Sequence, residues 1–189
     1  MKTKEHILKA ARGVFTRFGF NKSSMADIAF AAKKGRRTIY THFATKEDVF
    51  RAVIDREVKA LVKKLEMVCS QDIPPDEKLK TYMFARMGAV RELTVYYDAL
   101  RQDMIGNLGI IENLREEYDE IEVGLIQGIL DEGNIRGVFA VEDTRLVAGA
   151  IVMAAKGFEL PIFTGRKGYD HRPMIEPLIE ILYKGIRKQ

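Results

Sequence analysis

The sequence predicts an all-α protein, and three observations support that prediction. Apolar residues recur three and four positions apart along most of the chain, which is the spacing of one face of a helix. No stretch alternates apolar and polar residues for long enough to indicate a β-strand. Of the 189 residues 47% are hydrophobic, so the chain can bury a sizeable core. We expect about nine helices in two domains.

The first two predicted helices are short and have clear ends. The first covers residues 3–18, where a stripe of apolar side chains stops at Gly19. The second follows Ser24, whose hydroxyl can cap the free N–H groups at the start of a helix. Asp27 comes three residues later and completes a near capping box.

A tight turn and a third short helix come next. Lys33-Lys34-Gly35 interrupts the helical pattern, and we expect the glycine to bend the backbone there. The following helix begins at Arg36 and carries Ile39 and Phe43 on its apolar face. Its other faces carry hydrogen-bond donors. Two short helices around a tight turn, with donors on the second, fit a DNA major groove.

Longer helices make up the rest of the chain. We expect them over residues 45–69, 76–100, 112–132, 143–160 and 173–186. Thr45 is a good cap for the first of these. This helix has no internal proline, so we expect it to leave the DNA-binding part and enter the body of the protein. Pro161 is expected to stop the fourth.

The charge of the chain is unevenly distributed. Residues 1–50 contain 11 Lys and Arg against 4 Asp and Glu, a net charge of +7. Residues 51–189 contain 20 against 23, a net charge of −3, and the two sum to the overall +4. A basic N-terminal quarter on a mildly acidic body indicates that only the first part meets a polyanion.

Three blocks of this basic region share residue types and spacing with a known family. They are Ile7-Leu8-x-Ala10-Ala11-x-x-x-Phe15-x-x-x-Gly19-Phe20, Ser24-Met25-x-x-Ile28-Ala29 and Thr38-Ile39-Tyr40-x-His42-Phe43-x-x-Lys46-Glu47. Over residues 3–54 the chain resembles the N-terminal domain of the tetracycline-repressor (TetR) family. It departs at the turn: the family usually has Ala-Gly-Val-Ser there, and this chain has Ala32-Lys33-Lys34-Gly35.

The resemblance implies a sequence-specific DNA-binding transcriptional regulator, most commonly a repressor that responds to a ligand. It implies a three-helix helix-turn-helix domain over residues 1–48 and a helical effector-binding and dimerisation domain over residues 49–189. We therefore expect a homodimer on a palindromic double-stranded DNA operator, with an unidentified small-molecule effector and no cofactor.

The expected DNA-binding residues are donors on the third helix or beside it. They are Ser24, Arg36, Arg37, Thr38, Tyr40, Thr41, His42 and Lys46. The resemblance implies that Ser24, Tyr40, His42 and Lys46 hold phosphates, and that Arg37, Thr38 and Thr41 face bases. An arginine can make a bidentate contact to guanine. In the alternative interpretation, Tyr40 and His42 are core or rim residues and the arginines are only solvated.

Two further sets of residues are expected in the C-terminal part. The family pairs its last two helices into a four-helix bundle, which gives the expected dimer interface: Ala150, Ile151, Ala154, Phe158, Ile175, Leu178, Ile179 and Leu182. Apolar walls with a few polar groups are typical of small-molecule sites. The expected effector-binding residues are Phe84, Met87, Tyr97, Arg101, Met104, Tyr118 and Phe158. For both sets, packing in the chain's own core is the alternative.

The sequence gives no indication of an enzyme. His6, His42 and His171 lie apart, and none pairs with another at the spacing of metal ligands. The motifs of nucleophilic serines, phosphate-binding loops and dinucleotide sites do not occur. One group of carboxylates is expected to form a solvated helix face: Glu116, Glu117, Asp119, Glu120 and Glu122. We expect neither catalytic residues nor a metal site.

We expect a soluble, cytoplasmic protein. Cys69 is the only cysteine, so no internal disulfide can form and a reducing compartment fits. Lys9 and Arg12 interrupt the apolar run that a signal peptide needs. The longest uncharged stretch of the second half, residues 146–155, is about half of a bilayer span. The alternative function is a helical protein that binds a membrane surface or a protein partner through its basic N-terminal region.

Overall fold

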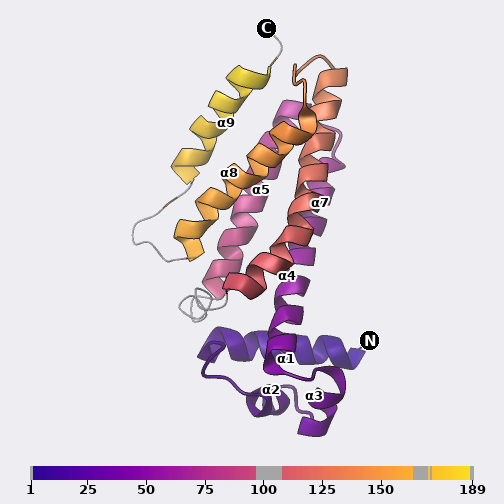
Figure 1. Ribbon diagram of the computed structural model, residues 1–189, viewed down its shortest axis with the longest axis vertical. Helices are drawn as coiled ribbons and strands as arrows, with labels where there is room; N and C mark the ends of the chain where they lie inside the picture. The colour runs from indigo at the N-terminus through magenta and orange to yellow at the C-terminus, as the bar shows by residue number, and fades with distance from the viewer. Residues whose placement is uncertain (1, 97–107, 164–169, 171, 188–189) are drawn as a thin grey trace. The chain divides into compact units, whose positions relative to one another are not determined.

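The computed structural model describes residues 2–96, 108–163, 170 and 172–187, and all regular elements in these ranges are helices (Figure 1). They are α1 (Lys2–Phe18), α2 (Met25–Ala31), α3 (Arg36–His42), α4 (Lys46–Cys69), α5 (Pro75–Tyr96), α7 (Leu108–Ile135), α8 (Thr144–Phe163) and α9 (Arg172–Ile186). The predicted all-α class is confirmed. The β-type backbone pairing in the described residues is one isolated antiparallel bridge between Phe139 and Arg187.

The chain forms two compact units. The first comprises Met1–Lys59 together with Glu92–Arg115, and the second comprises Ala60–Arg91 together with Glu116–Gln189. Helix α4 begins in the first unit and ends in the second, so the predicted single long helix over residues 45–69 is confirmed. The predicted domain boundary between residues 48 and 49 stays a prediction.

Helices α1, α2 and α3 and the start of α4 share one apolar core in the first unit. Phe15 from α1, Phe20 from the following loop and Phe50 from α4 contact one another, with ring centroids 4.8–5.9 Å apart. Ile28 of α2 and Ile39 of α3 are fully buried in the same cluster. Burying side chains of this size stabilises the folded state by about 1.5–3 kcal/mol each. The two short helices are therefore held by packing, since helices of seven residues are too short to be stable alone.

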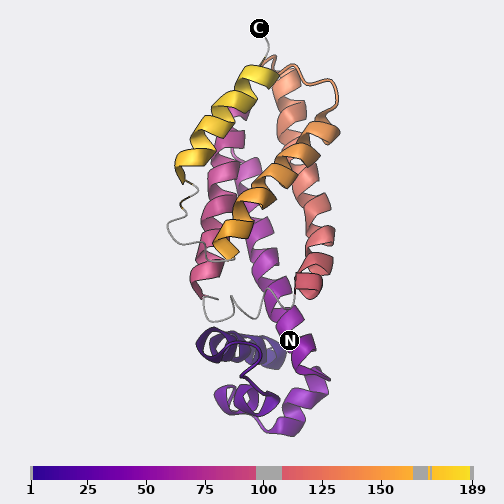
Figure 2. The same cartoon turned by 60° about the vertical axis from the view of Figure 1, so that its left-hand side comes forward.

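The second unit buries one continuous apolar cluster between the end of α4 and helices α5, α7, α8 and α9. Figure 2 shows α9 beside α5, and two polar contacts join these helices. Lys80 of α5 pairs with Glu176 of α9 at 2.8 Å, and the Tyr183 hydroxyl donates to the carbonyl of Asp76.

Helix α8 continues past Pro161 to Phe163, so the predicted stop at the proline is wrong. A proline in the last turn removes the one backbone hydrogen bond that its own N–H would donate, which weakens the helix there without ending it.

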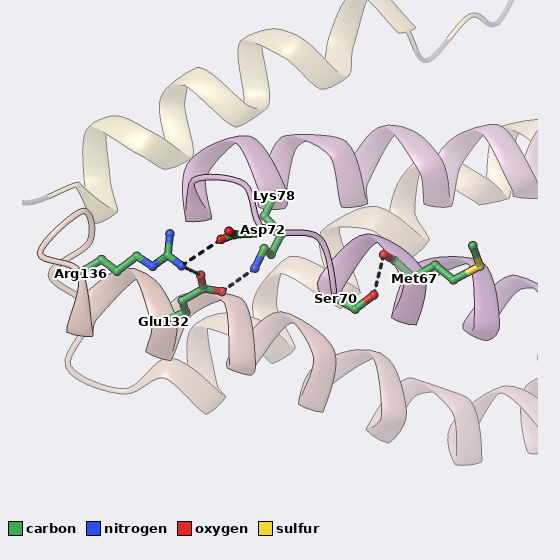
Figure 3. A network of polar contacts seen from close by, with 6 residues as sticks. All are labelled: Met67, Ser70, Asp72, Lys78, Glu132 and Arg136. Carbon is green, nitrogen blue, oxygen red and sulfur yellow. Dashed lines mark hydrogen bonds and ion pairs between the residues drawn. The ribbon is translucent and has the colours of Figure 1, made fainter.

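A network of charged side chains ties the start of α5 to the end of α7 (Figure 3). Glu132 accepts from the buried Lys78 ammonium at 2.7 Å and pairs through its other oxygen with Arg136 at 2.9 Å. Arg136 also lies 3.7 Å from Asp72 in the loop before α5. Because the Lys78 charge is buried, removing its partner would be far more costly than breaking a surface pair.

A second ion pair lies wholly inside this unit. The Arg86 guanidinium of α5 donates to Glu122 of α7 at 2.5 Å, and the two residues are only 1% and 5% exposed. Burial raises the pKa of the nearby Tyr82 hydroxyl, and the charge of Glu122 raises it further. The predicted solvated face is therefore wrong for Glu122. Its neighbour Glu120 is exposed and pairs with Arg145 of α8, as predicted, whereas Asp119 is half-buried in its pair with Lys156 of α8.

Two glycines at the end of α7 and just after it have structural roles. Gly137 has a φ of 69°, which a residue without a Cβ adopts without strain. The Gly137 N–H donates to Asn134 and the Val138 N–H donates to Gly133, the two hydrogen bonds of a Schellman motif. Gly133 is also required for packing, because a Cβ there would lie 2.0 Å from the Phe139 ring.

Candidate nucleic-acid interface

Helix α2 is fixed at its start by the capping box that the sequence predicts. The Ser24 hydroxyl accepts from the Asp27 N–H at 3.3 Å, and the Asp27 carboxylate accepts from the Ser24 N–H at 2.8 Å. The carboxylate also accepts from the Ser24 hydroxyl at 2.6 Å. The hydrogen bond from the Ser24 hydroxyl lowers the pKa of Asp27 most, and the hydrogen bond from the Ser24 N–H lowers it further. Ser24 is exposed at the start of the helix, with its hydroxyl proton committed to Asp27.

The turn between α2 and α3 bends at a lysine, so the expectation that Gly35 bends it is wrong. Lys33 has a φ of 50°, in the left-handed region, whereas the φ of Gly35 is an ordinary −65°. The Lys33 N–H donates to Phe30 and the Lys34 N–H donates to Ala29, each at 3.0 Å. This is again a Schellman motif, and its geometry places the left-handed residue directly after the C-cap. The departure from the family's turn sequence therefore puts a lysine at this strained position.

Histidine 6 supports this turn, which the sequence did not reveal. The His6 Nε2 atom lies 3.0 Å from the carbonyl oxygen of Ala32, the C-cap of α2. A carbonyl only accepts, so the imidazole donates. The two residues are 26 positions apart, and the helix that carries His6 shows no pattern that would single it out.

Helix α3 has one buried side and an exposed polar remainder. Ile39 is fully buried, and Phe43 at the C-cap is also in the core, as predicted. Tyr40 is 53% exposed and His42 is exposed, so neither is a core residue. The other expected DNA-binding side chains of this helix are placed as follows: Arg36, Arg37 and Thr41 are exposed, and Thr38 is half-buried. The Thr41 hydroxyl donates to the carbonyl of Arg37 at 2.9 Å.

Lysine 46 lies where α4 begins and is already engaged. Its ammonium donates to the carbonyl oxygens of Phe20 at 2.7 Å and Ser23 at 3.0 Å, and lies 4.2 Å from the centroid of the Phe20 ring. An ammonium has three donors, so one hydrogen remains for a phosphate. The start of α4 is fixed by Thr45 and Asp48, which cap each other's N–H groups at 3.0 Å.

The turn and the first residues of α3 form a concentration of positive charge. Lys33, Lys34, Arg36 and Arg37 fall within five residues and all are exposed. In the part of the chain that the structure describes, none of the four forms an ion pair. Some other cations of this unit are paired, as Arg12 is with Glu57 at 3.1 Å and Arg56 with Glu5 at 3.6 Å. The unpaired charges are available to an anionic partner.

The expected effector-binding residues lie partly inside the second unit. Met87 and Tyr118 are buried, Phe158 is half-buried, and Phe84 is at the border of exposure. Three further residues of this set lie outside the described residues or have no described side chain: Tyr97, Arg101 and Met104. Over the described residues no group of three His, Cys, Asp or Glu side chains could hold a metal ion.

The expected dimer residues divide into two groups. Ile151, Ile175 and Ile179 are buried in the second unit's own core. The remainder are exposed or half-buried: Ala150, Ala154, Phe158, Leu178 and Leu182. The same two helices carry large exposed apolar side chains that the expected set does not contain: Leu146, Met153, Met174 and Ile181. The sequence prediction missed them, although an apolar residue off the core stripe of a helix is a signal that could have identified them.

This fold and site define a helix-turn-helix DNA-binding protein with a separate helical unit. Residues 7–53 match the family model described as bacterial regulatory proteins, tetR family. The chain is 33% identical over 147 residues to an uncharacterized HTH-type transcriptional regulator, YhgD of Bacillus subtilis, covering 77% of this chain and 76% of the relative. It is 29% identical over 176 residues to the HTH-type transcriptional repressor BepR of Brucella suis, covering 89% and 84%.

The fold agrees with this relationship. A transcriptional regulator from Cytophaga hutchinsonii superposes with a TM-score of 0.80 at 22% identity, covering 97% of this chain and 98% of that one. The protein belongs to the TetR family of bacterial transcriptional regulators. No helix in the described ranges is long and apolar enough to cross a membrane.

Proposed function

We propose that this protein is a ligand-responsive repressor that binds a near-palindromic DNA operator as a homodimer. The observation that carries the proposal is the exposed face of α3. Its buried Ile39 seats the helix, while Arg36, Arg37 and Thr41 remain exposed beside a turn with two more cations. Repression is the better choice over activation because a similar relative, BepR, is named as a repressor. Acting on DNA places the protein in the cytoplasm.

The exposed residues divide by the contacts that their chemistry suits. Arg37, Thr38 and Thr41 are proposed to read base edges, since a guanidinium can bind guanine through two hydrogen bonds. Tyr40, His42 and Lys46 are proposed to hold phosphates, with Arg36 adding positive charge. Ser24 is proposed to join them when its hydroxyl proton turns from Asp27 to a phosphate oxygen. Phosphate contacts supply most of the affinity and make it fall steeply with salt, whereas base contacts choose the sequence.

Selection of bound duplexes from a random library tests this proposal most broadly. The expected product is a two-fold symmetric site with half-sites about one helical turn apart or a multiple of it. Arg37→Ala is expected to weaken binding to the selected site about fivefold to a hundredfold, as the loss of about 1–3 kcal/mol of discrimination requires. The same variant should lose much less affinity for an unrelated duplex. Equal affinity of Arg37→Ala and the natural protein for the selected site would show that Arg37 does not read bases.

The homodimer is proposed to form through the exposed apolar faces of α8 and α9. Leu146 is 70% exposed on α8, near the exposed Ala150 and Ala154, which allow close approach of a partner helix. Ile181 and Met174 provide exposed apolar surface on α9. Two copies in a symmetric pair would cover these side chains and present two α3 helices to a palindrome.

A charged substitution in this surface tests the dimer. Met153→Glu is expected to give a monomer in light scattering, because it places a charge in an apolar interface. Ile135→Glu is the matched control, since Ile135 is also strongly exposed but lies at the end of α7, outside the proposed surface. A monomeric mass for the natural protein, or dimers for both variants, would contradict the proposal.

The C-terminal part of the chain is proposed to bind a small-molecule effector through the expected residues, namely Phe84, Met87, Tyr97, Arg101, Met104, Tyr118 and Phe158. Two structurally similar proteins act in small-molecule biology, one described as a fatty acid metabolism regulator of Clostridium perfringens and one as a protein through which bacterial hormones control antibiotic production. The effector is proposed to favour a shape of this unit in which the dimer no longer fits its operator. A compound that binds tightly yet leaves operator affinity unchanged would contradict this step.

A further inference from the structure

Lysine 33 occupies a backbone position that ordinarily selects glycine. It is the residue directly after the C-cap of α2, with a φ of 50°, and is the single non-glycine residue with positive φ in the described part of the chain. A side chain in the left-handed region crowds the following carbonyl, so a lysine is disfavoured relative to glycine. The other left-handed residues described, Gly19 and Gly137, are both glycines.

The backbone hydrogen bonds of the turn hold Lys33 in this conformation, but its side chain gains no contact that would favour lysine over glycine there. The Lys33 side chain is exposed, and its ammonium has no hydrogen-bond or ion-pair partner among the described residues. The nearest acidic residue in sequence, Asp27, is already bonded to Ser24. Strained residues that gain nothing from their own fold are typical of binding sites.

Two other features of the next four residues forgo a little folding stability. Gly35 is the N-cap of α3 and supplies no side-chain hydrogen bond. Arg36 and Arg37 then place positive charge in the first turn, where the helix dipole disfavours cations. Each departure either adds a cation or forgoes a capping group, so all three give up folding stability at one exposed place. Departures that cluster in this way indicate a function for the segment.

We propose that Lys33 is a further DNA-binding residue, whose ammonium holds a backbone phosphate next to the bases read by α3. The inference rests on the proposed DNA-binding face of α3. Lysine suits this contact because it presents a compact charge on a flexible stem and needs no defined geometry. A phosphate contact of this kind adds affinity for every sequence and carries no base preference.

The test is the salt dependence of binding to a mixed-sequence duplex about three helical turns long, by fluorescence anisotropy. For Lys33→Gly the slope of log affinity against log salt between about 50 and 200 mM should become shallower by about 0.9 per protomer, and affinity at about 0.1 M salt should fall about tenfold per protomer. The same variant should melt about 2–4 °C higher, because glycine relieves the left-handed strain. Weaker binding by a more stable protein separates a contact from a folding defect.

Two controls sharpen the result. Lys33→Arg keeps the charge and should keep the natural slope, whereas Lys63→Gln removes one exposed charge from α4 in the second unit and should also leave the slope unchanged. An unchanged slope for Lys33→Gly would overturn the proposal for Lys33 alone. Failure of the natural protein to bind the duplex even at about 50 mM salt would instead overturn the proposed function.

Discussion

Helices α2 and α7 end in the same hydrogen-bonded motif but use different residues at its left-handed position. After α7 the position is Gly137, and the chain that follows folds back so that Phe139 packs on Gly133. After α2 the position is Lys33, exposed and unpaired among the described residues. The α7 turn packs within its own unit and uses the residue that the left-handed conformation prefers. The α2 turn precedes the proposed DNA-binding helix and keeps a cation there despite the strain.

The two units also differ in how their charged side chains are paired. In the second unit even buried charges are paired, as Arg86 is with Glu122 and Lys78 with Glu132. In the first unit the four cations of the turn and α3 have no partner in the described residues. Charges that stabilise a fold are paired within it, whereas charges meant for a partner molecule must be left available.

The largest effect is expected at the buried pair of the second unit. Glu122→Gln removes the negative charge that the buried Arg86 guanidinium contacts at 2.5 Å, so the free energy of unfolding should fall by about 3–5 kcal/mol. Urea unfolding followed by circular dichroism measures this change. Glu120→Gln is the control, because Glu120 lies on the same helix in an exposed pair with Arg145 and should change stability little. Equal effects of the two substitutions would contradict this assignment of roles.

The next effect concerns the packing of the α7 turn. Gly133→Ala places a Cβ 2.0 Å from the Phe139 ring, and relieving the overlap should cost about 1–3 kcal/mol of unfolding free energy. Gly128→Ala in the same helix meets nothing within 4 Å and should instead stabilise the protein, since alanine is the better helix former. Gly133→Ala should therefore cost less unfolding free energy in a protein that already carries Phe139→Leu than in the natural protein. A loss that is the same with either residue at 139 would rule out the overlap as its cause.

Exchanging the capping residue tests the comparison of the two turns directly. Gly137→Lys gives α7 the cap that α2 has, and should lower the unfolding free energy by about 1 kcal/mol because lysine is strained at a φ of 69°. Denaturant midpoints with an unchanged m-value report this difference. If Gly137→Lys were as stable as the natural protein, a lysine in this motif would carry no strain, and the argument for Lys33 would lose its first step.

The smallest effect is expected at the uncapped start of α3. Gly35→Ser supplies a hydroxyl that can accept from the free N–H groups of the first turn, and should raise stability by a few tenths of a kcal/mol. Gly35 already has the extended conformation of an N-cap and its missing Cβ leaves open space, so serine fits without rearrangement. Hydrogen exchange of the α3 amides is sensitive enough to detect it. Faster exchange in Gly35→Ser would mean that the cap does not form.

The helices could be predicted from the sequence because packing and capping are local patterns. The capping box of Ser24 and Asp27, the cap at Thr45 and the buried Ile39 all follow from residue type and spacing, and the structure confirms them. The site residues themselves stay predictions, although the structure does show that Tyr40 is exposed.

What could not be predicted depends on contacts between distant residues. Glu122 looked like its solvated neighbours because Arg86, its partner, lies 36 positions away on another helix. His6 and Ala32 are likewise far apart in sequence. The prediction for the turn was wrong because glycine is the usual left-handed residue. Here the hydrogen bonds of the helix end place Lys33 in that conformation. Residues 97–107, which include part of the expected effector site, lie outside the described residues.

Hydrogen exchange of the α2 and α3 amides, with and without a mixed-sequence duplex at low salt, tests the central claim most directly. Without DNA, exchange should be slower in Lys33→Gly than in the natural protein, because the variant's turn is unstrained. Adding the duplex should slow exchange more in the natural protein than in the variant. The natural protein should bind the duplex more tightly, and tighter binding stabilises the folded state more. Equal slowing by DNA in both proteins, or faster exchange of free Lys33→Gly, would contradict the claim that this turn keeps its lysine for DNA.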